Sequence, residues 1–466
     1  MRATRTRGRA AVAVVGVAVL VGGCSSDDSG GGEGEASGPL VVWTLENLPD
    51  RLAAQEEIAA AFTERSGIEV DLVGVDEDQF NQLLTSAAAA GELPDVVGAL
   101  PLAGVQALAA NELLDPDAAG SVVDELGADT FSEQSLELTR DGDTQLAVPS
   151  DGWAQLLLYR KDLFDAAGLA APETYDDILT AAKALDGPDL AGFTGANVAN
   201  DGFTQQTFEQ FALGNGCQLV DSDGEVTLDS DECVTAFEFY DELIGEYSPA
   251  GAQDVDTTRA AYFAGQASMV VWSSFILDEM AGLRADALPS CPECVADPAF
   301  LARNSGVVTA IAGPDGEGGA QFGEIVSWAI TAEAQPAAVD FVGYMMEDGY
   351  EQWIGFAPEG KVPTRQGTAD EPTRYIDAWS TLPAGVDTKA PLADFYPTDV
   401  LDALRTSPDT FTPWGISQGQ GALVGAALGE LPVPQALAAM TGGELEPAEA
   451  AQQAAEAVQE ISDSLG

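Results

Sequence analysis

The chain has 466 residues. That is beyond the size at which one hydrophobic core usually splits, so we expect at least two lobes. It contains no histidine, which excludes Ser-His-Asp and Cys-His nucleophiles and histidine-based zinc sites. Its 77 acidic and 18 basic side chains give a formal net charge of −59. A field of that sign disfavours nucleic acid and anionic membrane surfaces as partners.

The first residues have the features of an export signal. A basic head containing four arginines precedes an apolar run over residues 10–21, which is too short for a membrane span. The run ends at Val21-Gly22-Gly23-Cys24, which predicts a lipoprotein signal over 1–23 and lipidation of Cys24. An ordinary signal peptide with an incidental cysteine is the alternative. Removing the signal takes 4 of the 18 basic residues and no acidic one, which leaves 14 − 77 = −63 formal charges.

Residues 24–39 are rich in Ser, Gly, Asp and Glu, and we expect them to form a flexible tether. Four further cysteines follow in the exported part, an even number that predicts two disulfides. Nearest neighbours would pair Cys217 with Cys233 and Cys291 with Cys294, although four cysteines allow three pairings. The CxxC spacing of the second pair could also be a redox or metal motif, and a structural clip is the interpretation we favour outside the cytosol.

The globular part begins near Leu40 and first alternates strands with helices. Apolar and period-two patterns predict strands, and helical spacing predicts helices, in the order strand 40–43, helix 50–65, strand 68–75, helix 78–90 and strand 95–99. Gly67 is expected to end the first helix. This rhythm predicts a mostly parallel sheet with helices on its faces.

Residues 144–169 connect this region to the rest of the chain. We expect a strand at 146–148, a turn over Pro149-Ser150-Asp151-Gly152, a second strand at 153–159 and a helix that ends at Gly168. Such a crossover would carry the chain between lobes, and would place Asp151 and Trp153 at its bend to meet a ligand.

Helices dominate the remainder of the chain. Expected helices lie at 175–184, 203–213, 231–246 and 334–346, and expected strands at 269–272 and 325–330. Seven prolines divide the stretch from 363 to 413 into short pieces. The last predicted helix, 447–465, is amphipathic, and no repeat of solenoid period is present.

The available chemistry is narrow. No glycine motif follows a strand with nucleotide-binding spacing, so no cofactor or metal is expected. Paired carboxylates would suffice for a glycosidase, but 77 acids make chance pairs inevitable. An exported hydrolase therefore stays a minor alternative. Seven tryptophans are more informative, since five of them stand at predicted strand ends or bends, where open α/β sheets form ligand crevices.

Several short motifs occur along the chain in a characteristic order: Leu40-Val41-Val42-Trp43, Pro94-Asp95-Val96, Leu158-Tyr159-Arg160-Lys161-Asp162-Leu163-Phe164, Phe263-Ala264-Gly265-Gln266-Ala267-Ser268-Met269 and Lys361-Val362-Pro363-Thr364-Arg365. Together they resemble the maltose-binding-like family 1 of extracellular solute-binding proteins of bacterial ABC sugar importers. Their order and spacing cover nearly the whole mature chain. Arg160 stands where the family usually has asparagine.

The resemblance implies an α/β, two-lobed periplasmic-binding-protein-like fold of type II, with a hinge between the lobes and a ligand cleft. One lobe would hold residues 40–150 and 323–362, and the other 151–322 and 363–466. The protein would be a monomer on the extracytoplasmic face of the cell membrane, anchored there by lipid.

Ligand contacts are implied by matching positions one at a time. Glu46 and Asn47 match polar sugar contacts after the first strand, and Trp153 falls where a maltose binder has an acid, which makes maltose itself doubtful. The other ligand-facing positions implied are Gln205, Phe208, Trp272, Ser273, Phe275, Trp328, Arg365 and Trp414, with no catalytic residue and no metal ligand.

The resemblance implies a non-enzymatic receptor that captures a mono- or oligosaccharide and delivers it to ABC permease subunits. A receptor of the same fold for another solute, such as a polyamine, is the main alternative, since an acidic chain would accept a cation.

Overall fold

Parallel strands separated by helices form the N-terminal part of the fold. The computed structural model describes residues 38–427 and 429–465, apart from the side chain of Asp78. The predicted signal, Cys24 and the tether as far as residue 37 lie outside the described residues.

Three parallel strands confirm the predicted start of the globular part. The elements are β1 (Leu40–Thr44), α1 (Pro49–Ser66), β2 (Val70–Gly74), α2 (Glu77–Ala90) and β3 (Val96–Pro101). β1 lies between β2 and β3 and is parallel to both. α1 begins at a proline and ends at Gly67, which has a left-handed φ of 77° that glycine adopts without strain.

Short helices and a hairpin connect β3 to the central strand. They are α3 (Leu102–Ala110), α4 (Pro116–Leu126), the 3₁₀ turn η1 (Ala128–Thr130), α5 (Glu133–Leu138), β4 (Arg140–Asp141) and β5 (Thr144–Gln145).

The central strand β6 (Val148–Arg160) is continuous, so the turn predicted over residues 149–152 is wrong. β9 (Gly323–Ile330) and β10 (Val362–Pro363) flank this segment and hold it extended. The Pro-Ser-Asp-Gly signal appears instead as a register shift against β9 between Pro149 and Asp151. A bulge is one of the few places where a sheet accepts proline.

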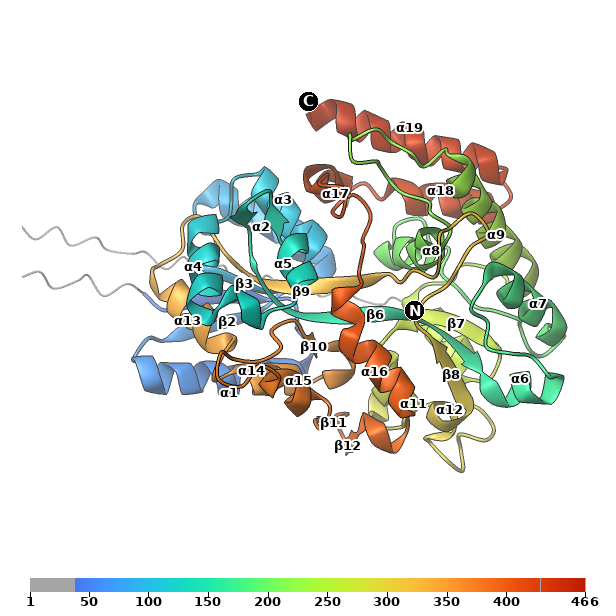
Figure 1. Ribbon diagram of the computed structural model, residues 1–466, viewed down its shortest axis with the longest axis horizontal. Coiled ribbons are helices and arrows are strands. Elements are labelled where there is room, and N and C mark those ends of the chain that lie inside the picture. The colour runs from blue at the N-terminus through green and yellow to red at the C-terminus, as the bar shows by residue number, and fades with distance from the viewer. Residues whose placement is uncertain (1–37, 428, 466) are drawn as a thin grey trace, which may run out of the picture. The chain divides into compact units, whose positions relative to one another are not determined.

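β6 changes partners along its length. Residues 148–154 pair with β9, while residues 155–160 pair with β7 (Met269–Ser273) and β8 (Ser305–Val308), all antiparallel. β3 is also antiparallel to β9, so the prediction of a mostly parallel sheet holds only for β1, β2 and β3. Figure 1 shows β6 and β9 running between the group of elements around α1–α5 and the group around α6–α12.

A group of helices accompanies β7 and β8. They are α6 (Lys161–Ala167), α7 (Tyr175–Leu185), α8 (Gly202–Gly214), α9 (Asp231–Tyr247), α10 (Val255–Phe263), α11 (Ile276–Met280) and α12 (Phe300–Asn304), with the 3₁₀ turn η2 (Ala285–Ala287). The predictions for α7, α8 and α9 are confirmed to within a residue or two. Thr174, Asp201, Ser230 and Asp254 cap α7, α8, α9 and α10 by accepting backbone N–H bonds.

The C-terminal third is made mostly of short elements, as the prolines between residues 363 and 413 predict, and ends in a helix of 19 residues. They are α13 (Ala337–Met345), α14 (Tyr350–Gly355), η3 (Pro358–Gly360), α15 (Arg374–Trp379), β11 (Pro383–Ala384), β12 (Ala390–Pro391), η4 (Leu392–Asp394), α16 (Thr398–Thr406), η5 (Ser407–Asp409), α17 (Gly421–Ala427), α18 (Pro432–Thr441) and α19 (Pro447–Leu465). The amphipathic α19 packs against α9 and α18, as Figure 1 shows at the C-terminus.

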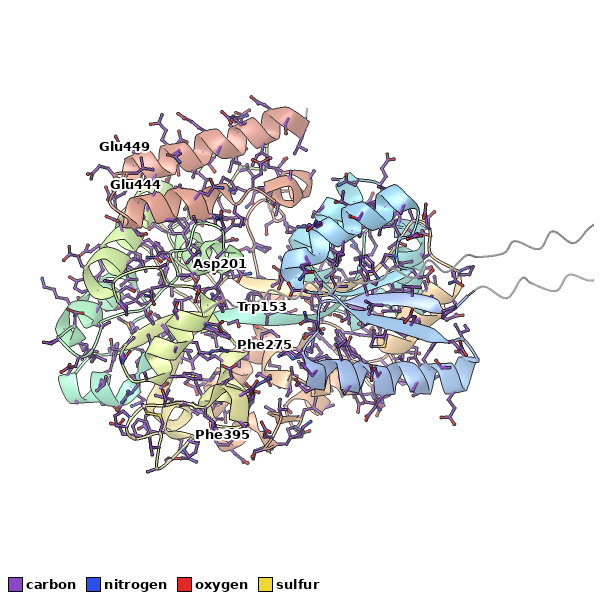
Figure 2. The ribbon with its side chains drawn as sticks, turned by 180° about the vertical axis from the view of Figure 1, so that it is seen from behind. Trp153, Asp201, Phe275, Phe395, Glu444 and Glu449 are labelled. Atoms are coloured by element: carbon purple, nitrogen blue, oxygen red, sulfur yellow. A yellow bond between two sulfur atoms is a disulfide. The ribbon has the colours of Figure 1, made fainter. Side chains whose placement is uncertain are left out.

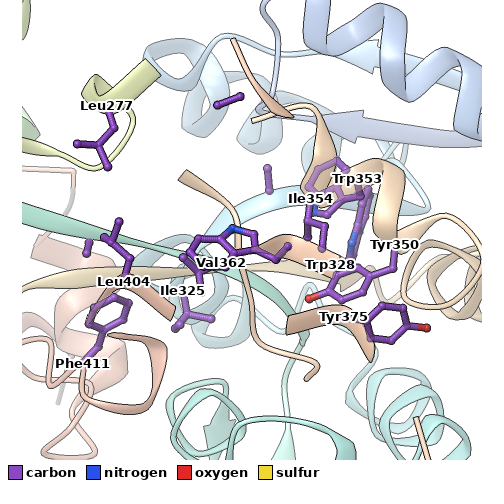
Figure 3. Packing of buried hydrophobic residues seen from close by; sticks show 14 of the residues in the cluster. Leu277, Ile325, Trp328, Tyr350, Trp353, Ile354, Val362, Tyr375, Leu404 and Phe411 are labelled. Carbon is purple, nitrogen blue, oxygen red and sulfur yellow. The ribbon is translucent and has the colours of Figure 1, made fainter. Parts of the chain in front are cut away.

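Two large hydrophobic cores lie on opposite faces of the second half of β6. Ala154, Leu156 and Leu158 belong to the first core, which also contains the rings of Trp328 and Trp353 (Figure 3). Leu157 and Tyr159 belong to the second core, built around α8 and α9. This alternation arises from the two-residue period of a strand. β6 is therefore covered on both faces.

The disulfides Cys217–Cys233 and Cys291–Cys294 confirm the nearest-neighbour pairing. In the described part of the chain no single helix is long and apolar enough to cross a membrane. The pair α17 and α18, which meet at a 55° bend, would be long and apolar enough only when the two helices are taken together.

Candidate functional site

Trp153 stands in the middle of β6, close to the point where the strand changes partners (Figure 2). It lies directly opposite Glu324 of β9. Directly opposed residues in an antiparallel pair project from the same face of the sheet, with Cβ atoms roughly 5 Å apart. An aromatic ring and a carboxylate are therefore neighbours at the centre of the crossing strands.

Trp153 remains half-buried, whereas five of the other six tryptophans are at most 7% exposed. Its ring meets the edge of Phe322 at 5.9 Å between centroids. The indole therefore keeps part of its surface accessible while one side is fixed by packing, which suits a stacking platform for a sugar ring.

Two carboxyl groups share this neighbourhood. Glu324 Oε1 accepts the backbone N–H of Leu102, at the start of α3, at 2.9 Å. Glu209 of α8 accepts the backbone N–H of Trp414 at 2.8 Å and a hydrogen bond from Gln205. Burial raises the pKa of Glu209 to about 7. Burial, together with the charge of Glu209, raises the pKa of Glu324 to about 8.

A second cluster of polar side chains forms around Lys361 and includes Asp151 of β6. Lys361 Nζ lies 2.6 Å from Glu46 Oε1 and 3.1 Å from Asp151 Oδ2, and stands over the Trp353 ring at 4.2 Å. Trp353 Nε1 donates to the other Asp151 oxygen at 2.5 Å. The contacting groups come from separate segments of the chain, so this charge cluster ties those segments together.

Glu46 also contacts Arg51, in the first turn of α1, at 2.6 Å. Burial alone would raise the pKa of Glu46, but Lys361 and Arg51 outweigh it and lower the pKa to about 2. The Arg51 guanidinium stands over the Phe275 ring at 4.8 Å. Glu46 and Phe275, both predicted as ligand contacts, are thus joined through one arginine.

Among the predicted ligand contacts, Asp151 has its carboxylate oxygens bound most completely by other residues of this cluster. It is 0% exposed, and its oxygens accept from Ser150, Trp353 and Lys361. In this structure Asp151 neutralises Lys361. Sequence reasoning missed Lys361 and Trp353 as its partners, although the lysine stands in a motif that the sequence already singled out.

The segment from the end of β7 to α11 holds three predicted contacts. Trp272 is mostly buried, donates its Nε1–H to the Val255 carbonyl at 3.0 Å, and has Arg259 over its ring at 5.6 Å. Ser273 and Phe275 are half-buried, as is Asn47 after β1. Figure 2 labels both Phe275 and Trp153 near the centre of the view. Ser273, Phe275 and Asn47 keep surface for a ligand.

Four other predicted contacts are part of the protein interior. Phe208 is 0% exposed and packs against Phe237, and Trp414 is 2% exposed. The Trp328 ring lies at 4.7 Å from that of Trp353 (Figure 3).

Arg365 is the fourth, and its contacts are structural. It is 1% exposed and donates to the carbonyl groups of Met346 and Leu126 and to Thr130 Oγ1. For these four residues the contacts favour packing over ligand binding, because almost no surface is accessible. The local sequence patterns could not distinguish a buried aromatic from a half-buried one.

Neither of two cavities in the structure coincides with the predicted contacts. One, of about 430 Å³, lies between α3, the β4–β5 hairpin and the segment before α17. The other, of about 420 Å³, lies between α1, α4 and α13. Among the described residues no group of three or more acids or cysteines is arranged to hold a metal ion.

Comparison with known proteins places the chain in a family. The profile of the bacterial extracellular solute-binding proteins matches residues 46–352. YcjN of Escherichia coli (strain K12), named as a putative ABC transporter periplasmic-binding protein, is 28% identical over 335 residues, which cover 70% of this chain and 72% of YcjN.

Solved structures share the fold at low identity. The GacH receptor of Streptomyces glaucescens, solved unliganded and with acarbose, is 21% identical with a TM-score of 0.69, over 92% of this chain and 99% of GacH. Maltose-bound MalE3 of T. maritima is 19% identical with a TM-score of 0.69, over 90% of this chain and 99% of MalE3. UgpB of Mycobacterium tuberculosis, in complex with glycerophosphocholine, is 19% identical with a TM-score of 0.67, over 92% of this chain and 99% of UgpB.

These likenesses show a mixed α/β periplasmic-binding-protein fold over most of the chain. With the family profile matching about two thirds of its length, the chain belongs to the bacterial extracellular solute-binding proteins, a family of non-enzymatic transport components.

Proposed function

We propose that this protein captures a carbohydrate outside the cytoplasm and delivers it to the permease of an ABC importer. The observation that carries the proposal is the half-buried Trp153 platform beside Glu324 on the crossing strands. Indole faces suit the apolar faces of sugar rings, and carboxylates accept hydrogen bonds from sugar hydroxyls. GacH and MalE3, which share the fold, are solved with acarbose and maltose.

The proposed lobes are those expected from the sequence, with residues 40–150 and 323–362 in one and 151–322 and 363–466 in the other. β6 and β9 connect them, so bending of these strands would open and close the site. Trp153, Asn47, Gln205, Ser273 and Phe275 are the predicted contacts that we retain, because each keeps accessible surface.

Membership of a non-enzymatic family argues against the hydrolase alternative. The test is a thermal-shift screen of neutral mono- and oligosaccharides, with recovery of each hit. A ligand at one hundred times its Kd adds about 2.7 kcal/mol to the free energy of unfolding. We expect at least one sugar to raise the Tm and to be recovered unchanged. Cleavage of the sugar, or stabilisation by a polyamine alone, would contradict the proposal.

Anchoring through Cys24 is part of the proposal and rests on the sequence, since a small-residue segment precedes a cysteine and a polar tether follows it. The test is expression in a bacterial host with a radiolabelled fatty acid. Wild type should be labelled and remain with the membrane, and Cys24→Ser should be unlabelled and released. Equal labelling of the two proteins would contradict the anchor.

A further inference from the structure

Glu209 and Glu324 differ from the buried acids of the Lys361 cluster because no basic side chain compensates them. Glu46 and Asp151 both contact Lys361. Within the described residues no ion pair joins Glu209 or Glu324 to a lysine or arginine, although Glu209 is only 3% exposed. Two carboxyl groups without a counter-charge at a half-covered tryptophan need an explanation, because desolvating such charges is costly.

Both acids lie near Trp153: Glu324 is its cross-strand partner, and Glu209 precedes Gln210, whose amide oxygen accepts the backbone N–H of Phe322 beside the Trp153 ring. Glu324 projects from the same face of the sheet as Trp153, since the two residues are directly opposite. Glu209 is close enough for its charge to act on Glu324, and Gln205 contacts Glu209 from one turn earlier in α8. Strands β6 and β9 and helix α8 therefore bring an aromatic ring and two acids into one region, which we call the Trp153 site.

Gln155 provides an independent observation. It is 0% exposed, and neither its amide oxygen nor its amide nitrogen has a hydrogen-bond partner. Because side chains alternate along a strand, Gln155 projects from the same face of β6 as Trp153. Its backbone N–H donates to the carbonyl of Phe322, whose ring packs against Trp153. A buried amide without partners on the face of β6 that carries Trp153 lacks the hydrogen bonds that such a group normally makes, and a polar ligand group could supply them.

The chemistry of the Trp153 site selects the charge of that ligand. An anion would be repelled by both carboxylates. A neutral sugar could exchange hydrogen bonds with the two acids in their protonated form but would gain no charge-assisted contact from them. A protonated amine would neutralise them with charge-assisted hydrogen bonds and would also be attracted to the indole face. The raised pKa of Glu209, about 7, and of Glu324, about 8, fit a site that binds protons when no cation is present.

We infer that the solute is a carbohydrate bearing a protonated amino group, which Glu209 and Glu324 bind while its ring stacks on Trp153. This inference rests on the proposed function, and it narrows the substrate class of the same site.

The experiment compares sugars that differ only in one substituent. Calorimetric titrations would use glucose, glucosamine and N-acetylglucosamine, and their β-1,4-linked disaccharides, with spermidine as an amine that lacks a sugar. We expect an amino sugar to bind at least tenfold tighter than its hydroxyl and acetamido counterparts. We also expect Glu209→Gln and Glu324→Gln to remove most of that preference, and the surface control Glu460→Gln, exposed on α19, to leave it unchanged.

Proton exchange gives a second readout that does not depend on the variants. Titrations at pH 7 in two buffers of different ionisation enthalpy count the protons that binding displaces. An ammonium group that replaces protons on the two acids releases them, so the amino sugar should release protons and the neutral sugar should not. Loss of this release in the Glu209→Gln and Glu324→Gln protein would support the assignment, provided that its thermal unfolding is still cooperative.

The outcomes separate this inference from the proposed function. Neutral sugars that bind as tightly as their amino counterparts overturn the inference and leave the carbohydrate receptor intact. Failure of every amino sugar to bind also overturns the inference. Binding of spermidine alone overturns both.

Discussion

Lys361 is a cation held entirely inside the protein. Its side chain is 0% exposed and contacts Glu46 and Asp151, which come from segments more than one hundred residues apart. The rings of Trp353 and Phe356 lie 4.2 and 5.0 Å from its Nζ. A buried pair is weak evidence for net stability, but removing one partner alone leaves uncompensated charge. The integrity of this cluster therefore depends on the lysine.

Replacing Lys361 by methionine should destabilise the protein strongly. The change leaves Glu46 with Arg51 only and Asp151 without a cation, so we expect the free energy of unfolding at pH 7 to fall by about 3–5 kcal/mol. Urea denaturation followed by circular dichroism measures the change. Lys389→Met is the matched control, because Lys389 is exposed, and it should change stability by less than about 0.5 kcal/mol. Equal effects of the two substitutions would contradict the structural role of Lys361.

For single residues, the sequence predicted which aromatic and acidic side chains lie near the crossing strands. It could not predict which of them remain accessible to a ligand. Trp153 and Trp328 look alike as tryptophans in apolar strands, yet only Trp153 is half-buried. Helix α13 and Trp353 cover Trp328 from outside its own segment. Long-range packing of that kind leaves no mark on the local pattern. The same holds for Arg365, whose guanidinium donates to the carbonyl group of Leu126, 239 residues away in the sequence.

At the scale of elements, α17 approaches α3 unusually closely. A Cβ on Gly425 would stand 2.7 Å from the backbone nitrogen of Ala107, and a Cβ on Gly421 would collide with the Gln106 side chain. Only glycine allows the two helices to pack at this separation. Since α3 and α17 belong to different proposed lobes, this contact stabilises the arrangement in which the lobes meet.

Gly425→Ala should therefore separate α17 from α3. The added methyl group meets backbone atoms that cannot rotate away, so we expect the free energy of unfolding to fall by about 1–3 kcal/mol. We also expect the affinity for the solute to fall by a larger fraction than the free energy of unfolding does. Gly245→Ala in α9 is the control, since a Cβ there has no neighbour within 4 Å and alanine should stabilise the helix by about 0.5–1 kcal/mol. Chemical denaturation and calorimetry measure the two effects. A neutral Gly425→Ala would show that the helices are free to move apart.

Helices and strands with a strong hydrophobic periodicity could be predicted from the sequence. The course of the chain through residues 149–152 and the direction of β9 could not. The parallel β1–β3 unit, α7, α8, α9 and α19 follow from apolar spacing. The turn expected at 149–152 is instead part of β6, because β9 and β10 supply hydrogen-bond partners on both sides. Pro149 and Gly152 are typical of turns in isolation, and only the distant strands decide otherwise. The antiparallel return of β9 likewise depends on a partner more than 150 residues away.

For the whole molecule, the absence of histidine has a simple consequence for pH dependence. With no histidine in 466 residues, folding between pH 5 and 8 responds mainly to carboxyl groups whose pKa is raised. Burial raises the pKa of Glu209 and Glu279 to about 7 and that of Glu324 to about 8. Each of these acids holds its proton more tightly in the folded than in the unfolded protein.

The unliganded protein should therefore lose stability as the pH rises from 5 to 8. The contribution of a raised pKa is fully present below the ordinary value of 4.5 and is lost as the pH passes through the folded value. Each pH unit by which the folded pKa exceeds the unfolded one corresponds to about 1.4 kcal/mol. Thermal unfolding across this range should show the Tm falling, with a smaller fall in Glu209→Gln and an unchanged fall in Glu460→Gln. A Tm that rises between pH 5 and 8 would contradict the assignment of protonated acids.

The placement of the solute at Trp153 is tested most directly by calorimetric titration of the tightest sugar from the screen into wild type, Trp153→Ala and a control, Trp43→Ala. Trp43 is also half-buried, but it lies in β1 away from the crossing of β6 and β9. We predict that Trp153→Ala weakens binding at least tenfold, about 1.4 kcal/mol, while Trp43→Ala keeps the wild-type affinity. Unchanged affinity in Trp153→Ala, with the protein folded, would contradict the placement of the solute at the crossing strands.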